Sequence, residues 1–145
     1  MKALLQRVSS ASVEIGGERV DEINRGILVL LGLDLDDDQA VADRMVEKML
    51  AYRIFPDDSG RMNCSVADVD GGVLLVSQFT LAADTGKGLR PGFSRAMPPA
   101  AAQPLYDYML QRLRQRHRTV AAGVFGADMQ VSLTNDGPVT FLLEV

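Results

Sequence analysis

The order of apolar and polar residues at the start of the chain predicts strands. Residues 1–8 and 11–15 alternate between the two types, and IGGER (Ile15–Arg19) predicts a turn after them. GILVLLGL (Gly26–Leu33) is almost wholly apolar, which is typical of a central strand buried on both faces. Val73–Val76 has the same character and predicts a second buried strand.

Two longer segments have the period of amphipathic helices. In residues 35–54, Asp36 is the expected N-cap, and one face holds the apolar residues Val41, Met45, Met49 and Tyr52. The second helix lies within residues 96–117, where Leu105, Met109 and Leu113 are spaced by four. Its first residue stays open, because three prolines each suit a first turn: Pro98, Pro99 and Pro104.

Three further runs, residues 120–124, 129–134 and 139–145, predict the last strands. Between the final two, Asn135-Asp136-Gly137-Pro138 has the residues of a hairpin turn, although proline offers no N–H to the ladder. No linker or repeat divides the sequence, so we expect a single domain over residues 1–145. The predicted fold class is α+β, a layered domain of mixed β-sheets with two main helices packed on one side.

Charge and composition restrict the partners. The 145 residues have a formal net charge of −4, which argues against nonspecific coating of DNA or RNA but permits binding of one RNA end. The arginines at positions 112, 114, 116 and 118 favour a solvated helix face. The charged first residues exclude a signal peptide, and no apolar run could span a membrane, so we expect a cytoplasmic protein.

The usual catalytic and ligand-binding sets of residues are absent. The one histidine, His117, follows a run of arginines, and the one cysteine, Cys64, is expected to be a buried structural residue. The aspartates between Asp34 and Asp38 suit helix capping better than a calcium loop. No phosphate-binding glycine loop is present, so neither metal nor cofactor is expected. The polar residues after the second buried strand, Ser77-Gln78-Phe79-Thr80, remain as the candidate site.

Two motifs resemble hallmarks of the D-aminoacyl-tRNA deacylase family: Ser77-Gln78-Phe79-Thr80-Leu81 and Asn135-Asp136-Gly137-Pro138-Val139-Thr140. The likeness runs nearly from end to end and includes QRVSSASV (Gln6–Val13), YRIFPDDSGRMNCSV (Tyr52–Val66) and KGLRPGF (Lys87–Phe93). Either motif alone would be a weak signal, but two at the right separation in a chain of this length are a strong one.

The resemblance implies an enzyme that hydrolyses the ester between a D-amino acid and the 3′-terminal adenosine of tRNA. It also implies a homodimer with its active site at the subunit interface, where a cis Gly137-Pro138 peptide enters the partner's pocket. The catalytic residues then fall on Ser77, Gln78, Phe79 and Thr80, with no metal, no cofactor and no DNA partner. Lys87 and Arg90 are either contacts to tRNA phosphates or solvated loop charges, and Arg7 is a candidate support for the Gly-Pro loop.

Rigid backbone beside the substrate's α-carbon can exclude one hand of a chiral centre by collision. Glycine leaves the backbone bare and proline keeps it stiff. Because a glycyl group has no side chain to collide, we expect glycyl-tRNA to be a substrate as well.

Two routes are open for the chemical step. Thr80 could attack the ester, although no base is evident to take its proton. Alternatively, the backbone N–H groups of Gln78, Phe79 and Thr80 stabilise the oxyanion while water attacks, assisted by the ribose 2′-hydroxyl. The lack of a basic partner favours the second route.

Without the resemblance, the residues describe a small α+β binding module with no catalysis. Hydrolysis of another acyl ester or of a thioester is a third hypothesis. Release of the amino acid from D-aminoacyl-tRNA separates the first two, and a free aminoacyl ester tests the third.

Overall fold

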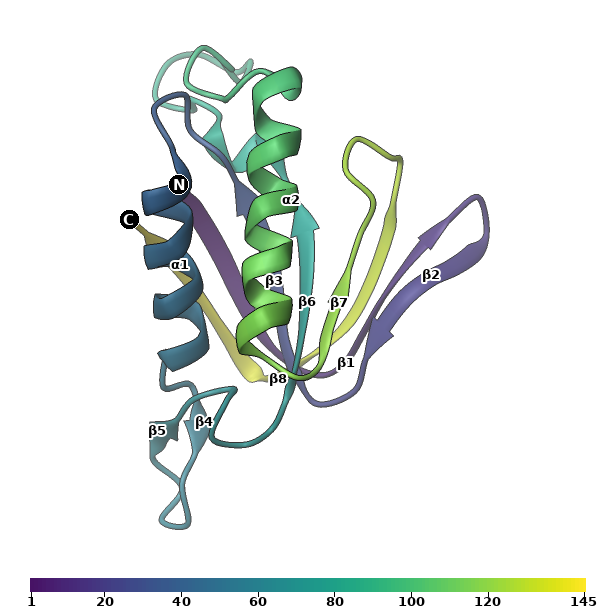
Figure 1. Ribbon diagram of the computed structural model, residues 1–145, viewed down its shortest axis with the longest axis vertical. Coiled ribbons are helices and arrows are strands. Elements are labelled where there is room, and N and C mark those ends of the chain that lie inside the picture. The colour runs from purple at the N-terminus through teal and green to yellow at the C-terminus, as the bar shows by residue number, and fades with distance from the viewer.

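A six-stranded mixed sheet forms the centre of the computed structural model, which describes residues 1–145. The helices α1 (Gln39–Ala51) and α2 (Pro99–Arg116) pack against each other on one side of this sheet (Figure 1). The fold is therefore α+β with both main helices on one side, as predicted.

The strands of the sheet follow the order β2-β1-β3-β6-β7, and β8 pairs with the free side of β1. β3 is antiparallel to β1 and parallel to β6, which is in turn parallel to β7. The bounds are β1 (Lys2–Ile15), β2 (Glu18–Ile23), β3 (Gly26–Gly32), β6 (Gly72–Ser77), β7 (Val120–Ala122) and β8 (Gln130–Glu144). A separate small hairpin consists of β4 (Phe55–Pro56) and β5 (Met62–Cys64).

β3 and β6 are the buried strands expected from their apolar sequences. Ile27, Val29 and Leu31 of β3 belong to the main core, which includes the helices, whereas Leu28 belongs to a second cluster. Since successive side chains of a strand point to opposite faces, both faces of β3 are covered. The two strands are parallel, so their carboxyl ends emerge at the same edge of the sheet.

The long strand β1 joins two parts of the sheet. Its first half pairs with β3 and its second half with β2, while β8 runs along most of its other side. The predicted turn after β1 is confirmed, with Gly16 and Gly17 at φ values of 59° and 83°. β2 was not predicted, because its sequence ERVDEI is mostly charged and lies as an exposed strand at the sheet edge.

The N-cap of α1 is Asp38 and not the predicted Asp36. Asp38 Oδ1 accepts a hydrogen bond from the Val41 N–H at 2.8 Å. The helix starts later because the preceding aspartates close the loop: Asp37 Oδ2 accepts from the Asp34 N–H at 2.7 Å. Capping was the role expected for these aspartates, but only Asp38 caps the helix, whereas Asp37 closes the loop before it.

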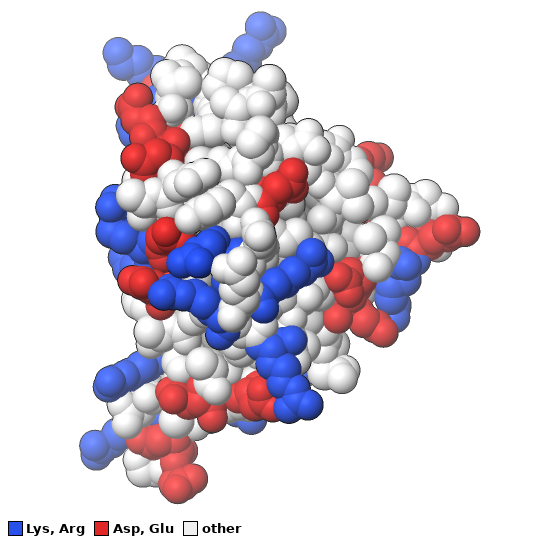
Figure 2. Space-filling view, in the orientation of Figure 1, with Lys and Arg blue, Asp and Glu red and all other residues white.

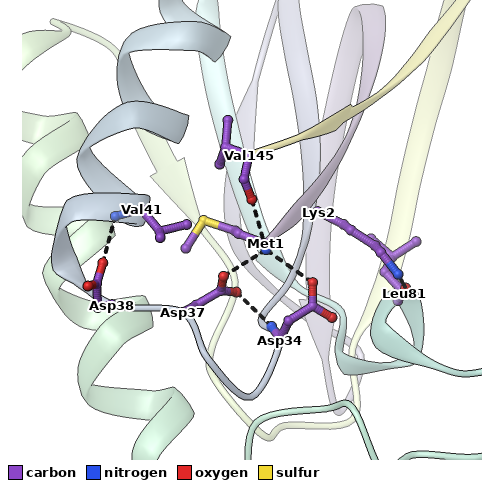
Figure 3. Close-up of polar contacts among 8 residues, drawn as sticks. All are labelled: Met1, Lys2, Asp34, Asp37, Asp38, Val41, Leu81 and Val145. Atoms are coloured by element: carbon purple, nitrogen blue, oxygen red, sulfur yellow. Dashed lines mark hydrogen bonds and ion pairs between the residues drawn. The ribbon is translucent and has the colours of Figure 1, made fainter.

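The start of β1 contacts both the loop before α1 and the segment after β6 (Figure 3). The α-amino nitrogen of Met1 donates to Asp37 Oδ1 at 2.7 Å and to Asp34 Oδ2 at 3.1 Å. Lys2 Nζ donates to the Leu81 carbonyl at 3.3 Å. Because Leu81 belongs to the first family motif, Lys2 links that motif directly to the sheet.

α2 begins at Pro99, and two of its arginines form ion pairs with carboxylates of α1. Arg112 Nε lies 2.8 Å from Asp43 Oδ1, and Arg116 Nη1 lies 3.0 Å from Glu47 Oε1. Figure 2 shows acidic and basic side chains side by side over this part of the surface. The arginine cluster is solvated, as predicted, but much of its positive charge is neutralised by neighbouring carboxylates.

Two residues set aside as structural differ in their surroundings. Cys64 is partly exposed, not buried as expected, because β5 belongs to the small hairpin that only edges the main core. His117 is buried, and its Nε2 lies 2.6 Å from the Gly71 carbonyl oxygen. Since a carbonyl only accepts, His117 donates this hydrogen bond and fixes the end of α2 to the segment before β6.

The hairpin turn predicted at Asn135–Pro138 is wrong. One strand, β8, runs through this stretch, and both of its halves pair with β1. The register passes from Gln6 opposite Thr140 to Val8 opposite Asn135, so β8 carries extra residues at that point. These residues, Asp136 to Pro138, form what we call the Gly-Pro bulge.

Candidate active site

The first motif lies where β6 ends. Ser77 is the last residue of β6, and Phe79–Ala82 form one 3-10 turn, η1. The Gln78 N–H donates to the Leu31 carbonyl of β3 at 2.7 Å, and Gln78 Nε2 donates to Thr80 Oγ1 at 2.6 Å. The sheet and this side-chain contact hold the motif at the edge of the sheet.

Two backbone N–H groups of η1 are free to bind a ligand. The first N–H groups of a helical turn have no acceptor within it. Those of Phe79 and Thr80 donate to no other group, whereas the Gln78 N–H is already used by Leu31. The expectation of three oxyanion donors is therefore wrong for Gln78, and two donors remain.

A mostly apolar cavity of about 710 Å³ lies beside the motif. Ser77, Gln78 and Phe79 contribute to its lining, together with α2, the loop before α2 and the β7–β8 loop. Lining residues from these other segments include Phe93, Met97, Tyr106, Phe125, Asp128 and Met129. Its volume is in the range of pockets that hold small organic ligands.

Tyr106 is a structural residue of this cavity. Its hydroxyl donates to the Leu75 carbonyl at 3.0 Å and lies 3.3 Å from the Gly123 carbonyl. Burial raises the pKa of Tyr106 well above its usual range, so the phenol stays protonated. It therefore ties α2 to the sheet and offers no base for catalysis.

The Gly-Pro bulge is held from two sides. Arg7 Nε donates to the Asp136 carbonyl at 3.1 Å, and Arg7 Nη1 donates to the Ile54 carbonyl at 2.7 Å. Asn135 Nδ2 donates to the carbonyls of Arg7 at 3.0 Å and Val139 at 2.9 Å. One amide thus links both ends of the bulge, while Arg7 attaches its first residue, Asp136, to the rest of the molecule.

Gly137 has no room for a side chain. Its φ is 132°, in the region that L side chains rarely adopt. A Cβ at this position would lie 2.7 Å from Val139 Cγ2 and 3.1 Å from Arg7 Nη2. The peptide bond to Pro138 is cis, and both residues are exposed. Bare backbone therefore faces solvent at the bulge.

A single chain does not bring the two motifs together. Arg7, opposite the bulge, pairs with Ile27 of β3, whereas Ser77 pairs with Leu31 of the same strand. Ile27 and Leu31 are four residue steps apart along β3, which corresponds to ~13 Å. Neither Gly137 nor Pro138 lines the cavity. Within one chain, the Gly-Pro bulge and the Ser77–Leu81 motif therefore lie at different positions along the strands of the sheet.

The predicted tRNA contacts, Lys87 and Arg90, are exposed in the loop between η1 and α2 and form no ion pair. No group of three or more His, Cys, Asp or Glu residues could hold a metal ion. No helix is long and apolar enough to cross a membrane.

Several cavity residues were not identified from the sequence. Phe93 lies in a stretch that carried the family resemblance, which is the signal that could have singled it out. No local pattern marked Tyr106, Phe125 or Met129, because they reach the cavity only through the packing of α2 and the β7–β8 loop.

Comparison with known proteins places the chain in a family. Residues 4–144 match the family described as D-Tyr-tRNA(Tyr) deacylase. A protein of Cellvibrio japonicus named D-aminoacyl-tRNA deacylase is 61% identical over 100% of this chain and 99% of its own length. One of the same name from Stutzerimonas stutzeri is 60% identical over 99% of both chains.

Two solved structures share the fold. The structure titled "c-Myc DNA Unwinding Element Binding Protein" is 47% identical, with a TM-score of 0.96 over 100% of this chain and 99% of that one. A probable eukaryotic D-amino acid tRNA deacylase is 17% identical, with a TM-score of 0.85 over 99% of this chain and 98% of that one. From its sequence over nearly its whole length, the chain belongs to the D-Tyr-tRNA(Tyr) deacylase family.

Proposed function

We propose that the protein hydrolyses the ester between a D-amino acid and the 3′-terminal adenosine of tRNA. The observation that carries this proposal is the mostly apolar cavity lined by Ser77, Gln78 and Phe79, next to the free N–H groups of Phe79 and Thr80. Membership of the deacylase family and full-length relatives of that name support it. Residues 1–145 act as one domain, and the substrate places it in the cytoplasm.

The complete active site forms between two copies of the chain. Gly137-Pro138 of one protomer enters the cavity of its partner, because the bulge is exposed and firmly held yet remote from the cavity of its own chain. In a two-fold symmetric dimer, a bulge that reaches the partner is matched by the reverse contact, which gives two equal sites.

The Gly-Pro bulge selects the D configuration by steric exclusion. Its bare backbone is anchored by Asn135 and Arg7, so it cannot withdraw from an L side chain that would collide with it. Glycyl-tRNA has no such side chain and is therefore hydrolysed as well. Enzyme that clears D-aminoacyl-tRNA but leaves glycyl-tRNA intact would show that exclusion by collision is the wrong account.

The chemical step relies on backbone groups. The N–H groups of Phe79 and Thr80 stabilise the oxyanion, and water attacks with help from the ribose 2′-hydroxyl. Ser77 and Gln78 line the cavity, and Gln78 orients the Thr80 hydroxyl. A nucleophilic role of Thr80 is disfavoured, because the cavity lining holds no histidine to take its proton.

Lys87 and Arg90 bind phosphates of the tRNA end. Both lie in the loop that leads from the motif to α2, and neither is neutralised by a carboxylate within the chain. Removing either charge should weaken tRNA binding and reduce its salt dependence.

The direct test is release of amino acid from purified charged tRNA. D-tyrosyl-tRNA and glycyl-tRNA should be deacylated, whereas L-tyrosyl-tRNA should remain charged. A free D-tyrosine ester, compared in parallel, tests the rival that any acyl ester is a substrate. Binding without release would leave only a binding module and overturn the proposal.

DNA binding is the second candidate, because the 47% identical structure is titled as a DNA unwinding element binding protein. The net charge of −4 and the pairing of α2 arginines with α1 carboxylates disfavour extensive contact with duplex phosphates. Titration of a labelled duplex at physiological salt tests this, and tight binding would favour the DNA role.

A further inference from the structure

The exposed aromatic rings of the protein occur together at one place. Phe79 of η1 is 61% exposed, and Phe93 of the following loop is 40% exposed. Their ring centroids are 5.1 Å apart with an interplanar angle of 49°. No other aromatic ring is among the exposed large hydrophobic residues. Exposing two apolar rings to water costs free energy, so an exposed aromatic pair indicates a binding site for a ligand.

The pair stands at the rim of the cavity. Both rings contribute to its lining, yet each keeps a large part of its surface in solvent. The lining also includes Phe125, Met129 and Tyr106, and Tyr106 is almost wholly buried. A nucleoside inside the cavity would therefore leave outer parts of Phe79 and Phe93 uncovered.

Unpaired positive charge lies in the loop that carries Phe93. The loop between η1 and α2 holds Lys87, Arg90 and Arg95, and none of them forms an ion pair. Its neighbouring acid, Asp84, is engaged by the Gly86 N–H at 2.9 Å. Figure 2 shows basic side chains projecting from the end of the molecule where this loop lies.

Exposed aromatic rings beside free cations are typical of sites for single-stranded nucleic acid, where bases stack and phosphates meet lysine and arginine. We propose that Phe79 and Phe93 form a stacking platform for the base of the nucleotide that precedes the terminal adenosine. This inference rests on the proposed function, in which the terminal adenosine occupies the cavity. The loop cations then meet the phosphates on either side of the stacked base.

The experiment compares two substrates. One is adenosine that carries a D-amino acid on its ribose, and the other is the trinucleotide CCA with the same ester. The measured quantity is the ratio of kcat/KM for the trinucleotide to that for the adenosine. Base stacking on an aromatic side chain provides about 5- to 150-fold, and contacts of the loop cations with phosphates add to it, so in the wild type this ratio should be at least about 5.

Phe93 is the ring to change, because Phe79 belongs to the catalytic motif. Phe93→Leu keeps an apolar side chain without a ring face and should lower the ratio at least about 5-fold, to the part that the loop cations and Phe79 supply, whereas Phe93→Tyr should keep the wild-type ratio. Leu89→Ala, in the same loop and fully exposed, is the matched control and should leave the ratio at its wild-type value.

The possible failures are distinct. Wild-type enzyme that hydrolyses neither substrate overturns the proposed function and the platform with it. Wild-type enzyme that hydrolyses both with a ratio near one overturns the platform alone. A ratio retained by Phe93→Leu, or lost equally in Phe93→Tyr, also overturns the platform.

Discussion

The amide of Asn135 offers a quantitative test of how the Gly-Pro bulge is held. Its Nδ2 donates to the Arg7 and Val139 carbonyls at 3.0 Å and 2.9 Å, so Asn135→Ala leaves two carbonyls without these donors. Each neutral hydrogen bond contributes ~0.5–1.5 kcal/mol, and water reaches this half-buried site, so we expect a loss of about 1–2 kcal/mol. For a chain of this size, that corresponds to a fall in Tm of about 3–7 °C.

The change should also affect selectivity. With its two ends no longer joined, the bulge should give way to an L side chain, so hydrolysis of L-tyrosyl-tRNA should rise relative to D-tyrosyl-tRNA. Melting followed by circular dichroism gives the first quantity, and deacylation of the two charged tRNAs gives the second.

Thr134→Ala is the matched control for this test. Thr134 is the exposed neighbour on β8, and its hydroxyl forms no hydrogen bond within the chain. It should change neither Tm nor selectivity. If Asn135→Ala had the same Tm as this control, the two hydrogen bonds of Asn135 would make no net contribution to stability. If it melted lower but kept full selectivity, Asn135 would not determine the position of the bulge.

Four further predictions concern catalysis, the bulge and the helices. Thr80→Ala should keep the turnover of D-aminoacyl-tRNA within a few fold of wild type, and total loss of turnover in folded protein would restore Thr80 as the nucleophile. A tRNA that ends in 2′-deoxyadenosine, with the amino acid on the 3′-oxygen, should be hydrolysed far more slowly than normal tRNA. Gly137→Ala should lower stability by about 1–3 kcal/mol, since its φ of 132° strains an L residue, and chemical denaturation measures this. The hydrogen bond from Arg112 holds the pKa of Asp43 below its usual value, so this pair stabilises the fold above pH 3.8 and the stabilisation is lost as pH falls through the lowered pKa. Asp43→Asn should therefore be less stable than wild type at neutral pH and equal to it in strong acid, as measured by denaturation at each pH.

Continuous apolar runs and helical periods were sufficient to predict much of the fold. β3 and β6 are buried on both faces, so their sequences carry the signal in every residue. β2 carries no such signal, because an exposed edge strand tolerates charge at most positions. The start of α1 was missed because four aspartates could each serve as its cap. Asp34 and Asp37 instead bind the α-amino group of Met1, a contact between residues far apart in the sequence that no local pattern shows.

The site could be predicted only in part. Turn-forming residues at Asn135–Pro138 suggested a hairpin, but the flanks on both sides keep pairing with β1, so tertiary structure turns the expected corner into a bulge. The anchoring of this bulge by Arg7 joins residues far apart in the sequence and has no local pattern. The distance between the two motifs likewise follows from strand register alone.

Mixed dimers test most directly whether the two motifs act across a subunit interface. Two variants are needed. Thr80→Pro removes one of the two free N–H groups and should lose hydrolysis, whereas changing Gly137 and Pro138 to alanine should keep hydrolysis but admit L-tyrosyl-tRNA. When the second variant is refolded with a large excess of the first, nearly every intact motif faces the intact bulge of its partner. We expect hydrolysis of L-tyrosyl-tRNA, per copy of the second variant, to fall to the wild-type background while hydrolysis of D-tyrosyl-tRNA persists. Hydrolysis of L-tyrosyl-tRNA that stays as high as in the second variant alone would show that the bulge and the motif do not combine across the interface.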